Sequence, residues 1–189
     1  IKMATGNAFT TEIQNRNFLS PVGFKFILNR CPKVAFFSNS ANIPGLSLGV
    51  AIQPSYLKDI DTPGDKIVFS DLTIRFLVDE DLQNYMEIQN WIRGLGFPDS
   101  LDEIYALQRE QKYVDTSDTK LMNIYSDGTL QVLTSSNTPN FKLKFKDLWP
   151  YQLSDLQFDA TDSDVEYLTS EVTFKYTIYD ITDLSGNKL

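Results

Sequence analysis

The chain has 189 residues, 42% of them hydrophobic, which is the size and composition of one folded domain with a sizeable core. Aromatic residues make up 13% and favour a β-rich fold, because flat side chains pack well on a pleated sheet. The net charge of −8 disfavours a nucleic-acid clamp, and a chain without histidine cannot build Ser-His-Asp or Cys-His catalytic sites or imidazole-based metal sites.

Cys31 is the single cysteine, so an internal disulfide is impossible and a reducing compartment fits best. We expect it to be a small buried side chain and not a nucleophile, because no base is visible to activate it. No run approaches the roughly 18 consecutive apolar residues of a membrane-spanning helix, and the N-terminus lacks the apolar segment of a signal peptide. We therefore expect a soluble protein made in a cytoplasm.

The first third of the chain predicts an arm, a pair of strands and a long excursion. Residues 1–17 are polar and predict a flexible N-terminal arm, followed by a single domain over 18–189. Residues 23–28 alternate as a short strand, and 34–37 predict a second strand after the break at Pro32. Residues 43–66 carry three prolines and three glycines and predict a long, partly extended loop that leaves the compact body.

The middle of the chain predicts a strand followed by a helix. Residues 67–79 alternate cleanly and predict a central strand. Its apolar face comprises Leu72, Ile74, Phe76 and Val78. The period then changes to three- and four-residue steps, which predicts a helix with Asp79 as its N-cap and an end at Gly94 or Gly96. The predicted apolar stripe of this helix comprises Leu82, Tyr85, Met86, Trp91, Ile92 and Leu95.

Residues 97–128 follow the predicted helix, and the resemblance described below implies that they are an insertion, because they are longer than a minimal subunit of that family requires. Ser100 and Glu103 have the spacing of a capping box, which predicts a second, more polar helix within it. Asp127-Gly128 predicts a turn between two short strands.

The last third predicts strands at 141–146 and 171–181, with a corner between them at Leu148-Trp149-Pro150. The elements together predict a mainly β, α+β domain: two sheets, or a distorted barrel, with a helix on one side.

Two acidic clusters are the candidates for catalysis, since a glycosidase needs only two carboxylates that flank the bond. They are Asp79-Glu80-Asp81 and the group Asp159, Asp162, Asp164 and Glu166. We favour simpler interpretations, a helix start for the first cluster and a solvated loop for the second. The second also resembles a calcium loop, but its spacing differs from that of an EF-hand and the turn glycine is missing.

The excursion at 43–66 is too apolar for a solvated loop. Its large apolar residues are Leu46, Leu48, Val50, Ile52, Tyr56, Leu57 and Ile60. Such a segment needs a partner surface, which is either the chain's own body or a neighbouring subunit.

Several short segments, taken in order, carry a resemblance. They are FLSPVGFKF at 18–26, Ile43-Pro44, PGDKIVFSDLTIRFLVDED at 63–81 with a helix reaching Trp91, KDLWP at 146–150, LSDLQFD at 153–159 and EVTFKYTIYD at 171–180. Their order and spacing resemble those of the tail-tube proteins of contractile-tailed, T4-like bacteriophages and their baseplate relatives.

This resemblance implies two orthogonally packed β-sheets with a flanking helix, and six copies that close into rings which stack into a tube. It makes Asp71, Trp91 and Leu148-Trp149-Pro150 landmarks of the fold, the last as a turn between two strands of the inner barrel. It also places stacking contacts between subunits in the excursion at 43–66. The predicted contact residues are Pro54, Tyr56, Leu57, Asp59, Ile60, Asp61 and Pro63.

The implied function is that of a structural virion protein without enzymatic activity or cofactor, a subunit of the tube that conducts the genome through a contractile tail. The implied partners are further copies, the sheath protein, baseplate tube-initiating proteins, and the tape-measure protein and double-stranded DNA in the lumen, the DNA without specific binding. The implied location is the tail of the virion, after synthesis in the host bacterial cytoplasm. A baseplate tube initiator or hub-associated protein of the same fold is the alternative, and a carboxylate-dependent glycan hydrolase or glycan-binding tail component is a third hypothesis.

Overall fold

The structure, a computed structural model, describes residues 19, 21, 23–109, 124–158 and 167–189. The expected arm at 1–17 and the acidic cluster at 159–166 lie outside these residues. The described elements are β1 (Phe24–Leu28), α1 (Pro32–Phe36), β2 (Ser38–Ala41), β3 (Leu46–Gln53), β4 (Ile60–Phe69), β5 (Leu72–Leu77), α2 (Gln83–Gly96), α3 (Asp102–Arg109), β6 (Ser126–Leu133), β7 (Pro139–Leu153), β8 (Thr169–Lys175) and β9 (Ile178–Thr182). No helix in these ranges is long and apolar enough to cross a membrane.

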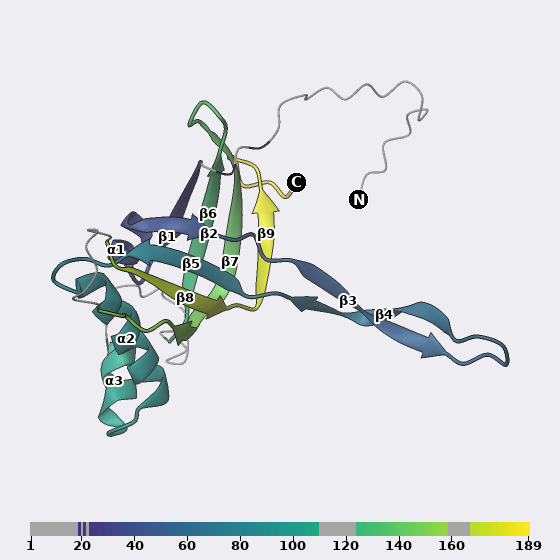
Figure 1. Ribbon diagram of the computed structural model, residues 1–189, viewed down its shortest axis with the longest axis horizontal. Coiled ribbons are helices and arrows are strands. Elements are labelled where there is room, and N and C mark those ends of the chain that lie inside the picture. Colours follow the sequence, from purple (N-terminus) through teal and green to yellow (C-terminus); the bar gives the residue numbers. More distant parts are fainter. Residues whose placement is uncertain (1–18, 20, 22, 110–123, 159–166) are drawn as a thin grey trace.

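Seven of the strands pair into one antiparallel sheet that is bent into two halves. The first half holds β1, β6, β9 and most of β7, and the second holds β2, β5, β8 and the end of β7. The two halves cross steeply in Figure 1, where β6, β7 and β9 run vertically while β2, β5 and β8 run horizontally. The expected pair of orthogonally packed antiparallel sheets is therefore confirmed. β1 and β2 lie at opposite ends of the strand order, so the described strands do not close into a barrel.

The predicted corner at Leu148-Trp149-Pro150 is wrong as a break between two strands. The 15-residue strand β7 runs through it, pairing with β6 and β9 as far as Leu148 and with β8 from Trp149 onward. Asp147 has a positive φ of 54°, and the register shifts on both sides, between Ser126 and Gly128 and between Pro150 and Gln152. Irregularities of this kind bend a strand without ending it, so one strand passes from one half of the sheet to the other.

Three other strand predictions are wrong because local pattern does not fix pairing. Residues 34–37 lie largely in the short helix α1, since Pro32 starts a helix there, and β1 pairs with β6 and not with a strand at 34–37. Residues 171–181 form two strands, β8 and β9, because the chain changes partners at the bend. Asp127-Gly128 lies inside the single strand β6, where a Cβ on the glycine would lie only 3.1 Å from a Leu148 methyl carbon.

The strand predicted over 67–79 is divided in the same way: its first residues end β4, and β5 starts only at Leu72. The alternation itself is confirmed, since Leu72, Ile74 and Phe76 are fully buried.

Helix α2 is confirmed, with corrected ends and face. It begins after Leu82, which is the N-cap in place of Asp79 and has a positive φ of 56°. It ends at Gly96 as expected. Buried Asn84 supports the start, because its side chain donates to the Leu77 carbonyl oxygen at 2.7 Å and accepts from the Asp79 N–H at 3.2 Å. Met86 is expected on the buried apolar stripe of the helix, but its side chain is exposed to solvent.

Helix α3 is also confirmed and packs on α2, where Gly94 leaves room for the side chain of Leu107. The Glu103 carboxylate pairs with Arg93 at 3.0 Å and accepts from the N–H of Asp99, one residue before the predicted cap Ser100.

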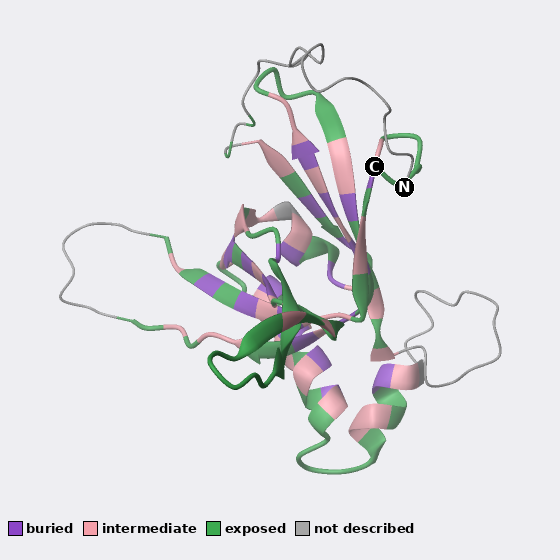
Figure 2. Ribbon diagram, turned by 90° about the vertical axis from the view of Figure 1, so that its right-hand side faces the viewer, coloured by how far each residue is buried: buried purple, intermediate pink, exposed green. Residues whose placement is uncertain are grey.

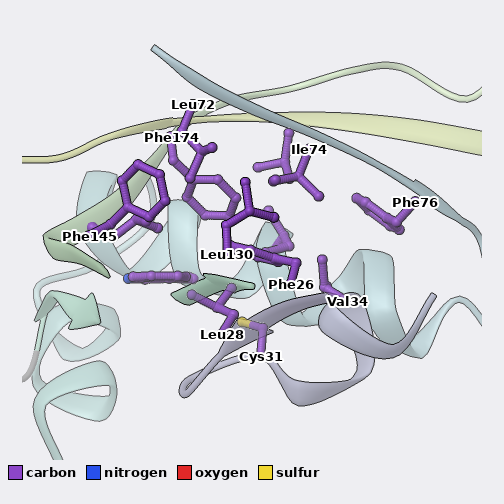
Figure 3. Close-up of a cluster of buried hydrophobic side chains, with 14 of the residues drawn as sticks. Phe26, Leu28, Cys31, Val34, Leu72, Ile74, Phe76, Leu130, Phe145 and Phe174 are labelled. Carbon is purple, nitrogen blue, oxygen red and sulfur yellow. The ribbon is translucent and has the colours of Figure 1, made fainter. Parts of the chain in front are cut away.

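The hydrophobic core fills the space between the two halves of the sheet and helices α1 and α2. Figure 3 shows Phe26, Phe145 and Phe174 meeting from different strands, with Cys31 buried at the edge of the cluster as expected. Trp91 closes the core from α2, and its indole N–H donates to the Ile124 carbonyl oxygen at 2.9 Å. The landmarks Trp91 and Leu148 are thus core residues, while the landmark Asp71 pairs with Lys175 at 2.6 Å.

Candidate functional site: a projecting hairpin arm

Strands β3 and β4 form a two-stranded antiparallel hairpin that projects far from the rest of the molecule, as Figure 1 shows. We call residues 46–69 the hairpin arm. The sequence analysis predicts a long, partly extended loop at 43–66; the structure pairs most of this segment as a regular hairpin, because β3 alternates apolar residues with small or polar ones, the pattern of a strand with one apolar face. The prolines of this segment disrupt the strand pairing little, because a two-stranded hairpin leaves the N–H groups on one side of each strand without a partner strand.

The apolar face of the hairpin arm is exposed. Leu46, Val50 and Ile52 of β3 are 59%, 66% and 64% exposed, and Figure 2 shows the arm almost wholly in the colour of exposed residues. The alternative that the excursion folds back on its own domain is therefore contradicted for the described residues. An exposed apolar face that runs along a strand in this way is typical of an interaction site.

All the predicted contact residues lie together at the outer end of the arm. Tyr56 and Leu57 are 100% and 91% exposed within the turn between the strands. Pro54 and Asp59 flank them in the same turn, and Ile60, Asp61 and Pro63 begin β4. Their placement at one tip agrees with the sequence analysis, and their contact with another subunit stays a prediction.

The two backbones of the arm approach each other closely at a glycine pair. The register shifts between Leu48 and Val50, and a Cβ added to Gly64 would lie 2.6 Å from the carbonyl oxygen of Gly49. Only a residue without a Cβ fits here unless the strands separate.

Replacing Gly64 with valine should therefore disrupt the arm while leaving the body folded. Amide chemical shifts in β3 and β4 should change, and shifts in β5 to β9 should stay near their wild-type values. Gly96→Ala is the matched control, because no atom lies within 4 Å of its added Cβ. Wild-type shifts throughout the arm of Gly64→Val would contradict the close approach.

The base of the arm is held by two tyrosines that sequence reasoning did not single out. Tyr179 donates from its hydroxyl to the Pro44 carbonyl oxygen at 3.0 Å, and Tyr176 donates to that of Ser70 at 2.7 Å. The ring of Phe69 packs edge-on against both, with centroid distances of 6.1 Å to Tyr176 and 5.8 Å to Tyr179. The residues that flank the arm are thus bound at one end by Tyr176, which lies between β8 and β9, and at the other by Tyr179 of β9. The signal in the sequence was the pair of tyrosines three residues apart in KYTIYD.

Burial raises the pKa of Tyr176 to about 12, and the charges of Tyr179 and Asp71 act in the same direction. The folded protein therefore holds this proton more tightly than the unfolded chain, in which tyrosine titrates near pH 10. The resulting stability is fully present below about pH 10 and is lost as the pH rises towards 12.

Replacing Tyr176 with phenylalanine should remove this contribution. Between about pH 9 and about pH 11, the free energy of unfolding measured with urea should fall less steeply in Tyr176→Phe than in the wild type. Tyr167→Phe, at a tyrosine that is 80% exposed, is the control variant. Equal slopes for wild type and Tyr176→Phe would exclude the raised pKa as a source of pH dependence.

The first acidic cluster is not part of a metal-binding group in the part of the chain that the structure describes. Asp79, Glu80 and Asp81 lie before α2, as a helix start predicts, and the second cluster at 159–166 is outside the described residues. Within the described ranges, no group of three or more Asp, Glu or Cys residues is placed to hold a metal ion.

The profile of a family described as phage tail tube protein matches residues 4–182, nearly the whole chain. The chain belongs to the phage tail tube protein family. The resemblance identified from the sequence is thereby confirmed.

Individual relatives agree with the family assignment. The tail tube terminator protein of Enterobacteria phage T4 is 24% identical over 148 residues, which is 76% of each chain. The sheath/tube terminator of an extracellular contractile injection system, PVC, has a TM-score of 0.58 at 15% identity, covering 89% of this chain and 99% of that one. A chain of the PVC sheath-tube complex has a TM-score of 0.54 at 13% identity, covering 89% and 94%. These solved structures share the fold of the family.

Proposed function

We propose that the chain is a ring-forming structural subunit of a contractile phage tail tube, and that its hairpin arm docks on a neighbouring copy. The observation that carries this proposal is the exposed apolar face of an arm that projects from a tail-tube body. An isolated two-stranded hairpin is marginally stable in water, so an arm of this length gains stability from a surface that covers it. A second copy supplies that surface each time a ring forms or stacks, and the symmetry of such a ring repeats the contact around it.

Within the tube, we place the subunit at the end, as a terminator ring, and treat the main tube and the baseplate initiator as the alternatives. The support is the relative from phage T4, whose name describes a tube terminator and which aligns over three quarters of both chains. The fold does not discriminate, because terminator and sheath-tube structures have similar TM-scores. The proposed partners are tube, sheath and baseplate proteins of the tail, and the tape-measure protein and genome pass through the lumen. The proposed role includes no chemical reaction.

Electron microscopy of negatively stained protein across a concentration series tests both parts of the proposal. A terminator should form single rings that do not lengthen with concentration, and it should limit the length of tubes when added to tube protein. Long tubes from the protein alone would assign it to the main tube instead. Monomers at every concentration, with or without tube protein, would contradict ring formation.

A further inference from the structure

Lysines gather on the outer face of the first half of the sheet. In β7, Leu143 and Phe145 are buried in the core, and Lys142, Lys144 and Lys146 alternate with them and face away from it. In β1 the same alternation turns Lys25 outward, between the core side chains of the strand. Strand alternation thus builds a row of positive charges into a chain whose net charge is −8.

The register places hydrogen-bonding side chains beside these lysines. Gln131 of β6 lies opposite Lys142 on one side and Lys25 on the other, and Thr129 lies opposite Lys144. Neighbouring strands are about 5 Å apart, and alternate residues along a strand are about 7 Å apart. The outer face is therefore a compact grid of ammonium, amide and hydroxyl groups.

Few carboxylates offset this charge. Asp180 lies opposite Lys144 in β9, and its carboxylate binds Lys188 at 2.8 Å, so it is already paired. The hydrogen bond from Lys188, together with the charges of Lys188 and Lys146, holds the pKa of Asp180 below its usual value. Asp127 is exposed near the start of β6. Lys25, Lys142, Lys144 and Lys146 make no ion pair with any described carboxylate.

We propose that this outer face binds the phosphate backbone of double-stranded nucleic acid. Lysine, threonine and glutamine side chains are among those that contact phosphates without reading sequence. Within β1, β6, β9 and residues 139–146 of β7, the exposed apolar residues include Ile27 and Ile178 and no aromatic ring, so these strands lack the stacking platform of a single-strand binder. The net charge of −8 disfavours a nucleic-acid clamp for the chain as a whole, whereas the lysines of this face provide a local attraction. The inference does not depend on ring formation.

Binding should be weak, independent of sequence and strongly dependent on salt. If about four lysines each displace one counterion, affinity for a duplex should fall on the order of 100-fold between about 50 and about 200 mM salt. The test is the fluorescence anisotropy of a labelled DNA duplex titrated with the full chain, at several salt concentrations.

Two matched variants locate the interaction. Lys144→Gln/Lys146→Gln removes two exposed charges from the face and should weaken binding at least tenfold at low salt, with a shallower salt dependence. Lys58→Gln/Lys66→Gln removes the same charge from the hairpin arm and should bind as the wild type does. Circular dichroism shows that each variant is folded.

Three results would overturn the proposal: no wild-type binding at about 50 mM salt, equal losses in both variants, or displacement of the duplex by polyglutamate as efficiently as by unlabelled duplex. The last result would assign the face to an acidic polypeptide. Each of these results leaves the ring proposal standing, because the anisotropy measurement does not require assembly.

Discussion

Charged replacements at the tip of the hairpin arm, Tyr56→Asp with Leu57→Asp, should leave the monomer folded and abolish assembly. Both side chains are almost fully exposed in the monomer, so the body loses no packing when they are changed. If each is buried between subunits, its apolar surface stabilises the contact by about 2 kcal/mol, and two together correspond to roughly 1,000-fold in the concentration needed to assemble. Burying carboxylates in their place adds a further cost of desolvation.

The measurement pairs thermal unfolding of the monomer with electron microscopy or light scattering of assemblies. The melting temperature should match that of the wild type, and rings should be missing at concentrations where the wild type forms them. Tyr56→Phe with Leu57→Met keeps both positions apolar and serves as the control that should still assemble. If the double aspartate variant formed normal assemblies, the tip would not be part of the interface between subunits.

Among single substitutions in the core, replacing Trp91 with alanine should lower the free energy of unfolding the most. The indole is 1% exposed, packs against Phe174 with ring centroids 6.3 Å apart, and lies under the guanidinium of Arg30 at 5.2 Å. Its loss leaves a cavity between α2 and the sheet and an unpaired carbonyl at Ile124, so we expect a cost of about 3–5 kcal/mol.

Urea unfolding followed by circular dichroism measures this cost. Trp91→Phe keeps most of the volume and loses the hydrogen bond, so it should cost less than the alanine variant. Tyr151→Ala, at an aromatic residue that is 58% exposed, is the surface control and should change stability by well under half as much. A Trp91→Ala protein as stable as the wild type would show that α2 does not close the core.

The sequence predicts the parts of this fold in which local pattern and burial agree. The alternation of Leu72, Ile74 and Phe76 predicts β5 correctly because one face of that strand lies entirely in the core. The three- and four-residue period that includes Trp91 predicts α2 for the same reason. Both ends of β5 and the start of α2 differ from the prediction, since turns and partners outside the pattern set them.

Elements whose form depends on distant partners could not be predicted in this way. The hydroxyls of Tyr176 and Tyr179 bind carbonyls 106 and 135 residues away in sequence, and the tyrosine pair in KYTIYD does not indicate which segment it binds. The apolar residues of the long excursion predict a partner surface, and the choice of contact residues at the tip follows from the resemblance and stays a prediction. The hairpin form of the arm was missed because its prolines and glycines outweighed the alternation of β3.

The passage of β7 through both halves of the sheet has a consequence for cooperativity. Separating either half breaks hydrogen bonds of the same strand, so the two halves should unfold in one transition. In native-state hydrogen exchange, the amides of β7 before and after Asp147 should exchange with similar protection, set by global unfolding. The amides of β3 and β4 lie outside this unit, and their protection should rise only when a second subunit covers them.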